Sequence, residues 1–137
     1  MTTVLVIGAT HGIGLATVRA ALARDMEVRA LARSALQAAK TFAAREARPV
    51  TWIAGDARDP AAIAQGLMGA QAVIWALGAG PTRKPVRLFS DSLSVLLPAM
   101  DAAGVRRLLA VTGIGAGDTR GHGGWFYDRV QQPLLLA

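Results

Sequence analysis

Residues 6–16, "VIGATHGIGLA", carry the clearest structural pattern in this chain. This stretch begins inside an apolar, β-branched run at 3–7, which predicts a buried strand. It leads into residues 13–24, which are rich in helix-forming side chains and predict a helix with a broad apolar face. Between the two lie three glycines: Gly8, Gly12 and Gly14. The stretch therefore predicts a tight turn from a strand into a helix.

Strand and helix patterns alternate along the rest of the chain. Further strands are expected at 26–33, 50–55, 72–77 and 106–113, and further helices at 34–47, 59–69 and 90–104. The strands are apolar along their length, as in a parallel sheet covered on both faces. The sequence therefore predicts an α/β fold: one Rossmann-like domain over 1–137 with a doubly wound parallel sheet in strand order 3-2-1-4-5.

Composition and charge exclude several classes of protein. Of the 137 residues, 53% are hydrophobic and none is cysteine, which excludes a disulfide framework and thiolate chemistry. His11 and His122 lack ligand spacing, so no metal site is expected. There is no signal-peptide pattern and no apolar run near the roughly 18 residues of a membrane span, which predicts a cytoplasmic protein without membrane segments.

The basic residues do not favour a nucleic-acid partner. The net charge is +6, but the arginines are scattered and only 83–87, "RKPVR", forms a basic cluster. A solvated arginine-rich surface, or an anionic small molecule bound at a few sites, explains the charge better than nucleic acid does.

A dinucleotide explains the glycine turn. In a doubly wound sheet this turn meets the pyrophosphate: the first glycine allows the turn, the second lets backbone approach the phosphates, and the third lets helix and strand pack closely. The amides at the start of the helix attract the negative charge. The alternative is a tight turn that binds no ligand.

The spacing Gly-x-x-x-Gly-x-Gly resembles that of the short-chain dehydrogenase/reductase family. Two further segments resemble it too: residues 54–78, "AGDARDPAAIAQGLMGAQAVIWALG", and residues 108–118, "LLAVTGIGAGD". The nearest likeness is to the atypical NAD(P)H-binding branch that includes biliverdin reductase B and flavin reductases. It implies a reductase that transfers hydride to a small molecule: a flavin, a quinone or another conjugated carbonyl compound.

The end of the second predicted strand favours NADP(H) over NAD(H). An NAD site usually has a carboxylate there, whereas this chain has Arg33, followed by Ser34. A guanidinium suits the 2′-phosphate of NADP, and His11 would add a second donor beside it. The alternatives are an ordinary exposed arginine and a surface turn histidine.

The resemblance assigns the remaining cofactor residues. Those in the glycine turn are Gly8, Thr10, His11, Gly12, Ile13 and Gly14. Asp56 and Ala57 would lie near the adenine, and Leu77, Gly78 and Ala79 along the ribose and nicotinamide. The alternatives are a turn or cap role for Asp56 and a simple strand-end turn for residues 77–79.

The catalytic assignment is less complete than the family pattern. Thr112 ends the fifth predicted strand and could hydrogen-bond a substrate carbonyl, or only backbone. Tyr127 matches the family tyrosine, but Gln131 stands where the Tyr-x-x-x-Lys pair has lysine. Tyr127 could instead anchor a loop, and solvent could supply the proton. A non-catalytic NADP(H)-binding redox sensor or interaction module is therefore the alternative function.

The last residues lead to two expectations. Relatives continue further and build much of their substrate side there, so we expect a chain that lacks this part. The apolar ending "PLLLA", residues 133–137, has nothing after it to cover it. This predicts either self-association into a homo-oligomer through the C-terminus or a disordered tail.

Overall fold

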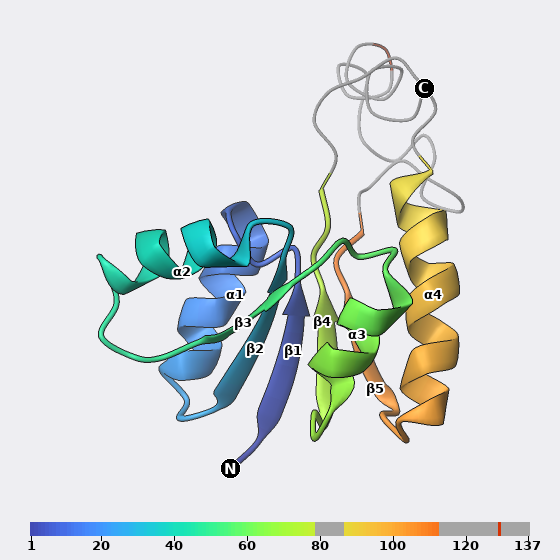
Figure 1. The fold of residues 1–137 in the computed structure, drawn as a ribbon, viewed down its shortest axis with the longest axis horizontal. Helices are drawn as coiled ribbons and strands as arrows, with labels where there is room; N and C mark the ends of the chain where they lie inside the picture. The colour runs from blue at the N-terminus through green and yellow to red at the C-terminus, as the bar shows by residue number, and fades with distance from the viewer. Residues whose placement is uncertain (79–86, 113–128, 130–137) are drawn as a thin grey trace.

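The computed structural model describes residues 1–78, 87–112 and 129. Strands and helices alternate in the predicted places (Figure 1). The strands are β1 Thr3–Ile7, β2 Glu27–Ala32, β3 Thr51–Ala54, β4 Ala72–Trp75 and β5 Arg107–Ala110. The helices are α1 Gly12–Leu22, α2 Ala35–Ala43, α3 Pro60–Leu67 and α4 Leu88–Ala102. Most elements are shorter than predicted by a few residues at their ends.

The sheet has the predicted order β3-β2-β1-β4-β5, and all the pairings are parallel. Ile7 of β1 is in register with Leu31 of β2 on one side and with Trp75 of β4 on the other. The carboxyl ends of these three strands therefore meet at one edge of the sheet. The chain winds from β1 to β3 in one direction and returns to place β4 beside β1, so the strand order reverses between β1 and β4.

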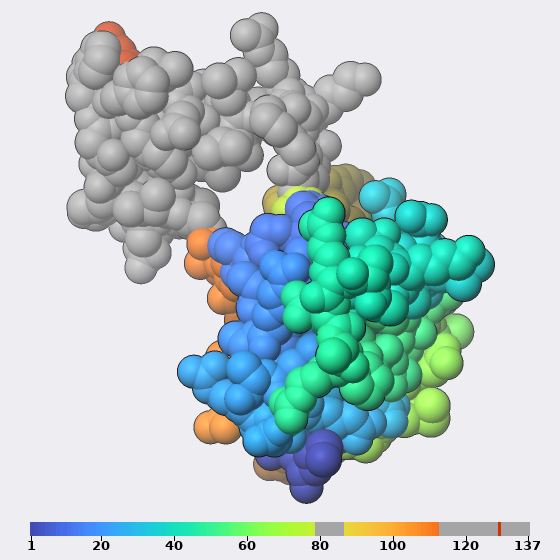
Figure 2. Space-filling model, turned by 90° about the vertical axis from the view of Figure 1, so that its left-hand side faces the viewer, coloured from blue at the N-terminus to red at the C-terminus, as the bar shows by residue number. Residues whose placement is uncertain are grey.

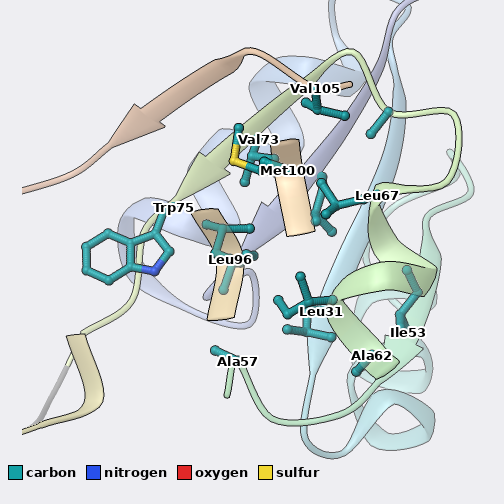
Figure 3. Close-up of a cluster of buried hydrophobic side chains, with 14 residues drawn as sticks. Leu31, Ile53, Ala57, Ala62, Leu67, Val73, Trp75, Leu96, Met100 and Val105 are labelled. Carbon is teal, nitrogen blue, oxygen red and sulfur yellow. The ribbon is translucent and has the colours of Figure 1, made fainter. Parts of the chain in front are cut away.

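One face of the sheet packs against α3 and α4. Leu5 and Val73 of the sheet, with Leu96 and Met100 of α4, belong to a buried cluster on this face (Figure 3). Trp75 lies in the same cluster, and its indole Nε1 donates a hydrogen bond of 3.3 Å to the buried Ser92 Oγ. The one polar atom of the Trp75 ring is thus satisfied inside the apolar layer.

The other face packs against α1 and α2. Val6 of β1, Val18 of α1 and Phe42 of α2 are buried together there. The rings of Phe42 and Trp52 meet edge to face with centroids 5.9 Å apart, which joins α2 to β3. The molecule is therefore three layers deep, with helices on both sides of the sheet (Figure 1).

Burial of β5 on both faces was expected, and the structure corrects this. Leu108 packs against the cluster of α3 and α4, but Leu109, which points to the opposite face, is 50% exposed. Its neighbour in register on β4, Ile74, is half-buried. Within the described ranges, the main strand contacts of α1 are with β1 and β2. An apolar strand sequence thus does not guarantee that both faces are covered.

The residues predicted to begin and end α3 are confirmed, and the residue predicted to begin α2 is confirmed only in part. Asp59 accepts a hydrogen bond of 3.0 Å from the amide of Ala61, and Pro60 begins α3. Gly69, just past the end of this helix, has a φ of +72°. Ser34 does precede α2, but its side chain makes no capping hydrogen bond, so the predicted serine cap is wrong in that respect.

None of the helices in the described part of the chain combines the length and the apolar character that crossing a bilayer requires. The apolar segment 133–137 and the basic residues 83–86 lie outside the described residues.

Candidate functional site

Two of the three glycines in the turn after β1 permit close backbone packing. Gly8 has a φ of +86°, and a Cβ added there would lie 2.4 Å from the carbonyl oxygen of Ala76, just after β4. A Cβ on Gly14 would lie 1.9 Å from the carbonyl oxygen of Gly8. Only glycine therefore allows α1, β1 and β4 to meet as they do. This geometry agrees with the roles predicted for the first and third glycines.

Gly12 differs from its two neighbours. Its φ is +55°, and a Cβ added there would meet no heavy atom within 4 Å. Packing therefore does not explain a glycine at this position, although its positive φ favours one. Open space beside a backbone that no side chain shields is what the close approach of a phosphate requires.

A cavity of about 320 Å³ lies at the carboxyl ends of the strands, and we call it the strand-end cleft. It adjoins the point where the strand order reverses, which is the usual ligand-binding place in such sheets. The structure brings eight predicted cofactor residues together in its lining: Gly8, Thr10, His11, Arg33, Asp56, Ala57, Leu77 and Gly78.

The other predicted site residues lie elsewhere. Ile13 follows Gly12 in the first turn of α1 and is 61% exposed, so it is not part of the apolar face expected for this helix. Ser34 lines a neighbouring cavity, and Thr112 is exposed just beyond β5. Ala79 and Tyr127 lie outside the described residues.

His11 stands at the N-cap position of α1 in extended conformation, with a φ of −156°, and its side chain makes no capping bond. Its Nδ1 lies 3.0 Å from the hydroxyl oxygen of Thr10. This contact leaves the Nε2 side of the exposed ring free of described partners. That His11 offers a donor to a ligand in the cleft stays a prediction.

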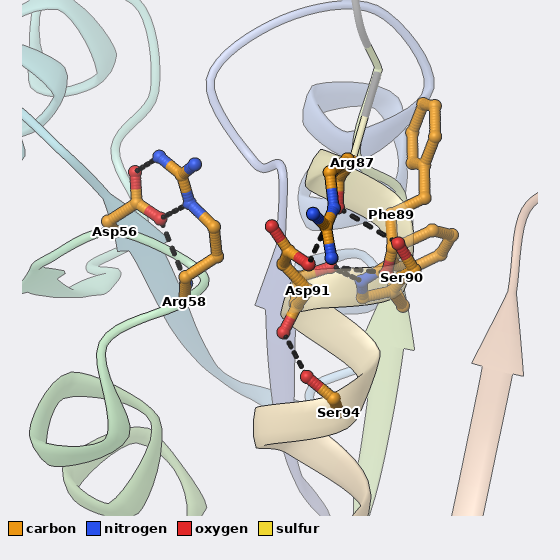
Figure 4. A network of polar contacts seen from close by, with 9 residues as sticks. Asp56, Arg58, Arg87, Phe89, Ser90, Asp91 and Ser94 are labelled. Atoms are coloured by element: carbon orange, nitrogen blue, oxygen red, sulfur yellow. Dashed lines mark hydrogen bonds and ion pairs between the residues drawn. The ribbon is translucent and has the colours of Figure 1, made fainter. Parts of the chain in front are cut away.

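Arg58 is a cleft residue that the sequence analysis missed. Its Nε and Nη2 donate to the two carboxylate oxygens of Asp56 at 2.8 and 3.0 Å, and its backbone amide donates to Oδ1 at 2.9 Å (Figure 4). The Asp-x-Arg spacing in "GDAR" was the available signal, since an aspartate side chain often binds the amide two residues on. Asp56 is thus paired within its own turn, which is the turn role given above as the alternative to a place near the adenine.

The pair changes the acidity of Asp56. The hydrogen bonds from the Arg58 side chain, and then from its backbone amide, lower the pKa of the Asp56 carboxyl from 3.8 to about 2. The positive charge of Arg33 acts in the same direction to a smaller extent. Asp56 is therefore ionised at neutral pH.

Substituting Arg58→Ala is expected to return the Asp56 pKa toward 3.8, because the largest cause of the shift is removed. The pair's contribution to stability is present above pH 3.8 and is lost as the pH falls toward about 2, since protonation then breaks the ion pair. Carbon-13 NMR titration of the Asp56 carboxyl measures this. An equally low pKa of Asp56 in the Arg58→Ala variant would mean that a group other than the Arg58 side chain stabilises the carboxylate.

The cleft as a whole fits a dinucleotide. Arg33, Arg58 and His11 bring cationic or donor groups to its polar side, and the amides of the first turn of α1 lie beside the open position of Gly12. Apolar residues such as Leu77 and Leu88 provide surface for a ring. Within the described residues, no group of three or more histidine or acidic side chains could hold a metal ion.

Comparisons with known proteins agree with this geometry. Residues 8–137 match the NAD(P)H-binding family. ChuY, an anaerobillin reductase from Escherichia coli O157:H7, is 25% identical and superposes with a TM-score of 0.77 over 98% of this chain and 62% of its own. The chain thus spans less than two thirds of that relative's length.

Two more distant structures share the fold. One is a short-chain dehydrogenase/reductase from Veillonella parvula in complex with NADP, with 18% identity, a TM-score of 0.65, and coverage of 83% of this chain and 48% of that one. The other is UDP-glucose 4-epimerase from Bifidobacterium longum with NAD⁺ and UDP, with 23% identity, a TM-score of 0.67, and coverage of 82% and 37%. The resemblance to short-chain dehydrogenases/reductases is confirmed, and the chain belongs to the NAD(P)H-binding family.

Proposed function

We propose that this chain is the cofactor-binding domain of an NADP(H)-dependent reductase of the atypical short-chain type. The observation that carries the proposal is the strand-end cleft, where Arg33 follows β2 and where no carboxylate takes its place. The one carboxylate among the described lining residues, Asp56, is held by Arg58. Neither residue favours a bare ribose hydroxyl over a phosphate.

Each part of the cofactor has a proposed partner. The pyrophosphate would lie over Gly12 and the first turn of α1, the 2′-phosphate beside Arg33 and His11, and the adenine near Asp56 and Ala57. Leu77 and Gly78, after β4, would face the ribose and nicotinamide. When bound, the cofactor supplies a hydride, and the protein orients it toward the acceptor and excludes water.

The proposed acceptor is a flavin, a quinone or another conjugated carbonyl compound. The relative ChuY is a reductase, which supports reduction as the type of reaction. Thr112 follows β5 at the same edge of the sheet as the cleft, because the strands are parallel and in register. Its hydroxyl is proposed to donate to the acceptor's carbonyl oxygen, with the proton coming from solvent.

Loss of NADPH absorbance with a panel of flavins and quinones tests the activity. Turnover that requires the acceptor supports a reductase, and Thr112→Val should then lower kcat. Tight NADPH binding with no turnover of any acceptor would contradict the reductase and favour the redox sensor. The observation behind that second function is the Tyr127–Gln131 pair in place of Tyr-x-x-x-Lys.

Arg33→Ala should weaken NADPH binding and leave NADH binding nearly unchanged. A charge-assisted hydrogen bond contributes roughly 1.5–3 kcal/mol, which is about 10- to 150-fold in affinity. Arg33→Asp should weaken NADPH further, because it repels the phosphate and offers an acceptor to the ribose. Calorimetric titration of both cofactors into the wild type and the two variants measures the six affinities.

Arg24→Ala is the matched control for the change in net charge. Arg24 lies just after α1, donates to the carbonyl oxygen of Ala20, and does not line the cleft. The Arg24→Ala substitution should leave the affinities for NADPH and NADH unchanged. If Arg33→Ala weakens NADH as much as NADPH, or if the wild type binds both equally well, the 2′-phosphate assignment is wrong.

A further inference from the structure

A second cavity lies between α1 and α2, separate from the strand-end cleft but next to it. Its volume is about 310 Å³, within the roughly 300–1,000 Å³ typical of small-molecule sites. Figure 2 views the molecule from the side on which α1 (blue) and α2 (teal) lie next to each other. Thr10 and Arg33 line both cavities and therefore lie between them. We call this cavity the interhelix pocket.

The polar side of the interhelix pocket is positively charged. Arg19, Arg33 and Arg45 all line it. Arg19 is neutralised by Glu46, whose Oε1 lies 2.6 Å from the Arg19 Nε. Among the described residues, Arg33 and Arg45 form no ion pair. Two guanidinium groups therefore remain to attract an anion, and Ser34, whose side chain makes no cap bond, also lines the pocket.

The inner side of the interhelix pocket is apolar and aromatic. Leu15 of α1, Phe42 of α2 and Trp52 of β3 contribute to it. Phe42 is only 7% exposed, and its edge-to-face contact with Trp52 holds both rings in place. A rigid surface of this kind favours a flat apolar group, and stacking of a ligand ring needs no reordering of the side chains.

We propose that the interhelix pocket binds a small organic anion: a flat, apolar body on Phe42 and Trp52, with a carboxylate, sulfonate or phosphate directed at Arg33 and Arg45. The combination of a charged rim and an aromatic floor selects this class over inorganic phosphate, which lacks the body, and over neutral aromatics, which lack the charge. Because Arg33 is shared, the ligand competes with the cofactor for it. This second statement rests on the proposed role of Arg33 toward the 2′-phosphate.

Direct binding to the cofactor-free protein tests the pocket itself. Calorimetric titrations use 2-naphthoate, neutral 2-naphthalenemethanol and inorganic phosphate as probes. Naphthoate is expected to bind more tightly than either of the others. Arg45→Ala should weaken naphthoate by roughly 10-fold, the lower end of what a charge-assisted bond contributes.

Three further variants keep this test decisive. Arg24→Ala removes the same charge outside the pocket and should not change naphthoate binding. Trp52→Phe keeps a ring in β3 and should weaken naphthoate less than Trp52→Leu does. The proposal is overturned if the alcohol binds as tightly as naphthoate, or if Arg45→Ala has no more effect than Arg24→Ala.

Competition with the cofactors tests the sharing of Arg33. Naphthoate should raise the apparent Kd of NADPH and leave that of NADH unchanged, since only NADPH has the 2′-phosphate. If naphthoate binds in an Arg45-dependent way without affecting NADPH, the competition is overturned and the pocket stands. If NADPH and NADH bind equally well without naphthoate, it is the proposed cofactor preference that fails.

Discussion

Gly12→Val is expected to abolish dinucleotide binding while the sheet still forms. The valine side chain would project into the open space beside the first turn of α1, where a Cβ meets no protein atom within 4 Å and where we place the pyrophosphate. Strain from a φ of +55° costs about 1–2 kcal/mol for a residue other than glycine, which a folded domain can tolerate. Calorimetric titration of NADPH, with circular dichroism of the same sample, measures both effects.

Gly69→Val is the matched control for this variant. Gly69 has a φ of +72°, a Cβ there also meets nothing within 4 Å, and the residue follows α3 rather than the cleft. The Gly69→Val protein should be destabilised by a similar amount and should bind NADPH like the wild type. A folded Gly12→Val protein with unchanged NADPH affinity would remove the cofactor assignment of the glycine turn.

Gly14→Ala is expected to lower the free energy of unfolding by more than about 3 kcal/mol, the upper end of ordinary overpacking. The added Cβ would lie 1.9 Å from the Gly8 carbonyl oxygen and 2.7 Å from its carbon, and both are backbone atoms. No side chain can give way, so α1 must move off β1. Urea unfolding followed by circular dichroism measures the loss as a lower midpoint.

Gly66→Ala provides the comparison for a contact that can relax. Its added Cβ would meet the two terminal methyl groups of Leu5 at 2.8 and 3.0 Å, and a side-chain rotation can relieve that contact. Its loss of stability should therefore be clearly smaller than that of Gly14→Ala. Equal urea midpoints for the two variants would show that the turn after β1 is not packed as described.

The parts of the fold predicted correctly from the sequence are those with local causes. Asp59 and Pro60 start α3 and Gly69 follows it, because cap hydrogen bonds and φ preferences involve only neighbouring residues. The strand order followed because alternating apolar strands and helices leave few arrangements with right-handed crossovers. The cap hydrogen bond predicted for Ser34 does not form, because a residue type that favours such a bond does not ensure it.

The candidate site was predictable where it depends on the ends of parallel strands. Gly8, Arg33, Asp56 and Leu77 follow four different strands, and parallel pairing in register brings such positions to one edge. The pairing of Asp56 with Arg58 was not predicted, because it depends on how the turn after β3 directs two side chains.

Backbone preferences and apolar periodicity act over short distances, so the strands, the helices and the glycine turn could be predicted from the chain, and the crossover rules then gave the strand order. The half-exposed Leu109 of β5, and the cavity that Arg19, Arg45 and Trp52 surround, became apparent in the folded molecule. Exposure and cavities arise where separate elements pack. The residues that meet there are set by helix position and side-chain direction, which no local pattern encodes.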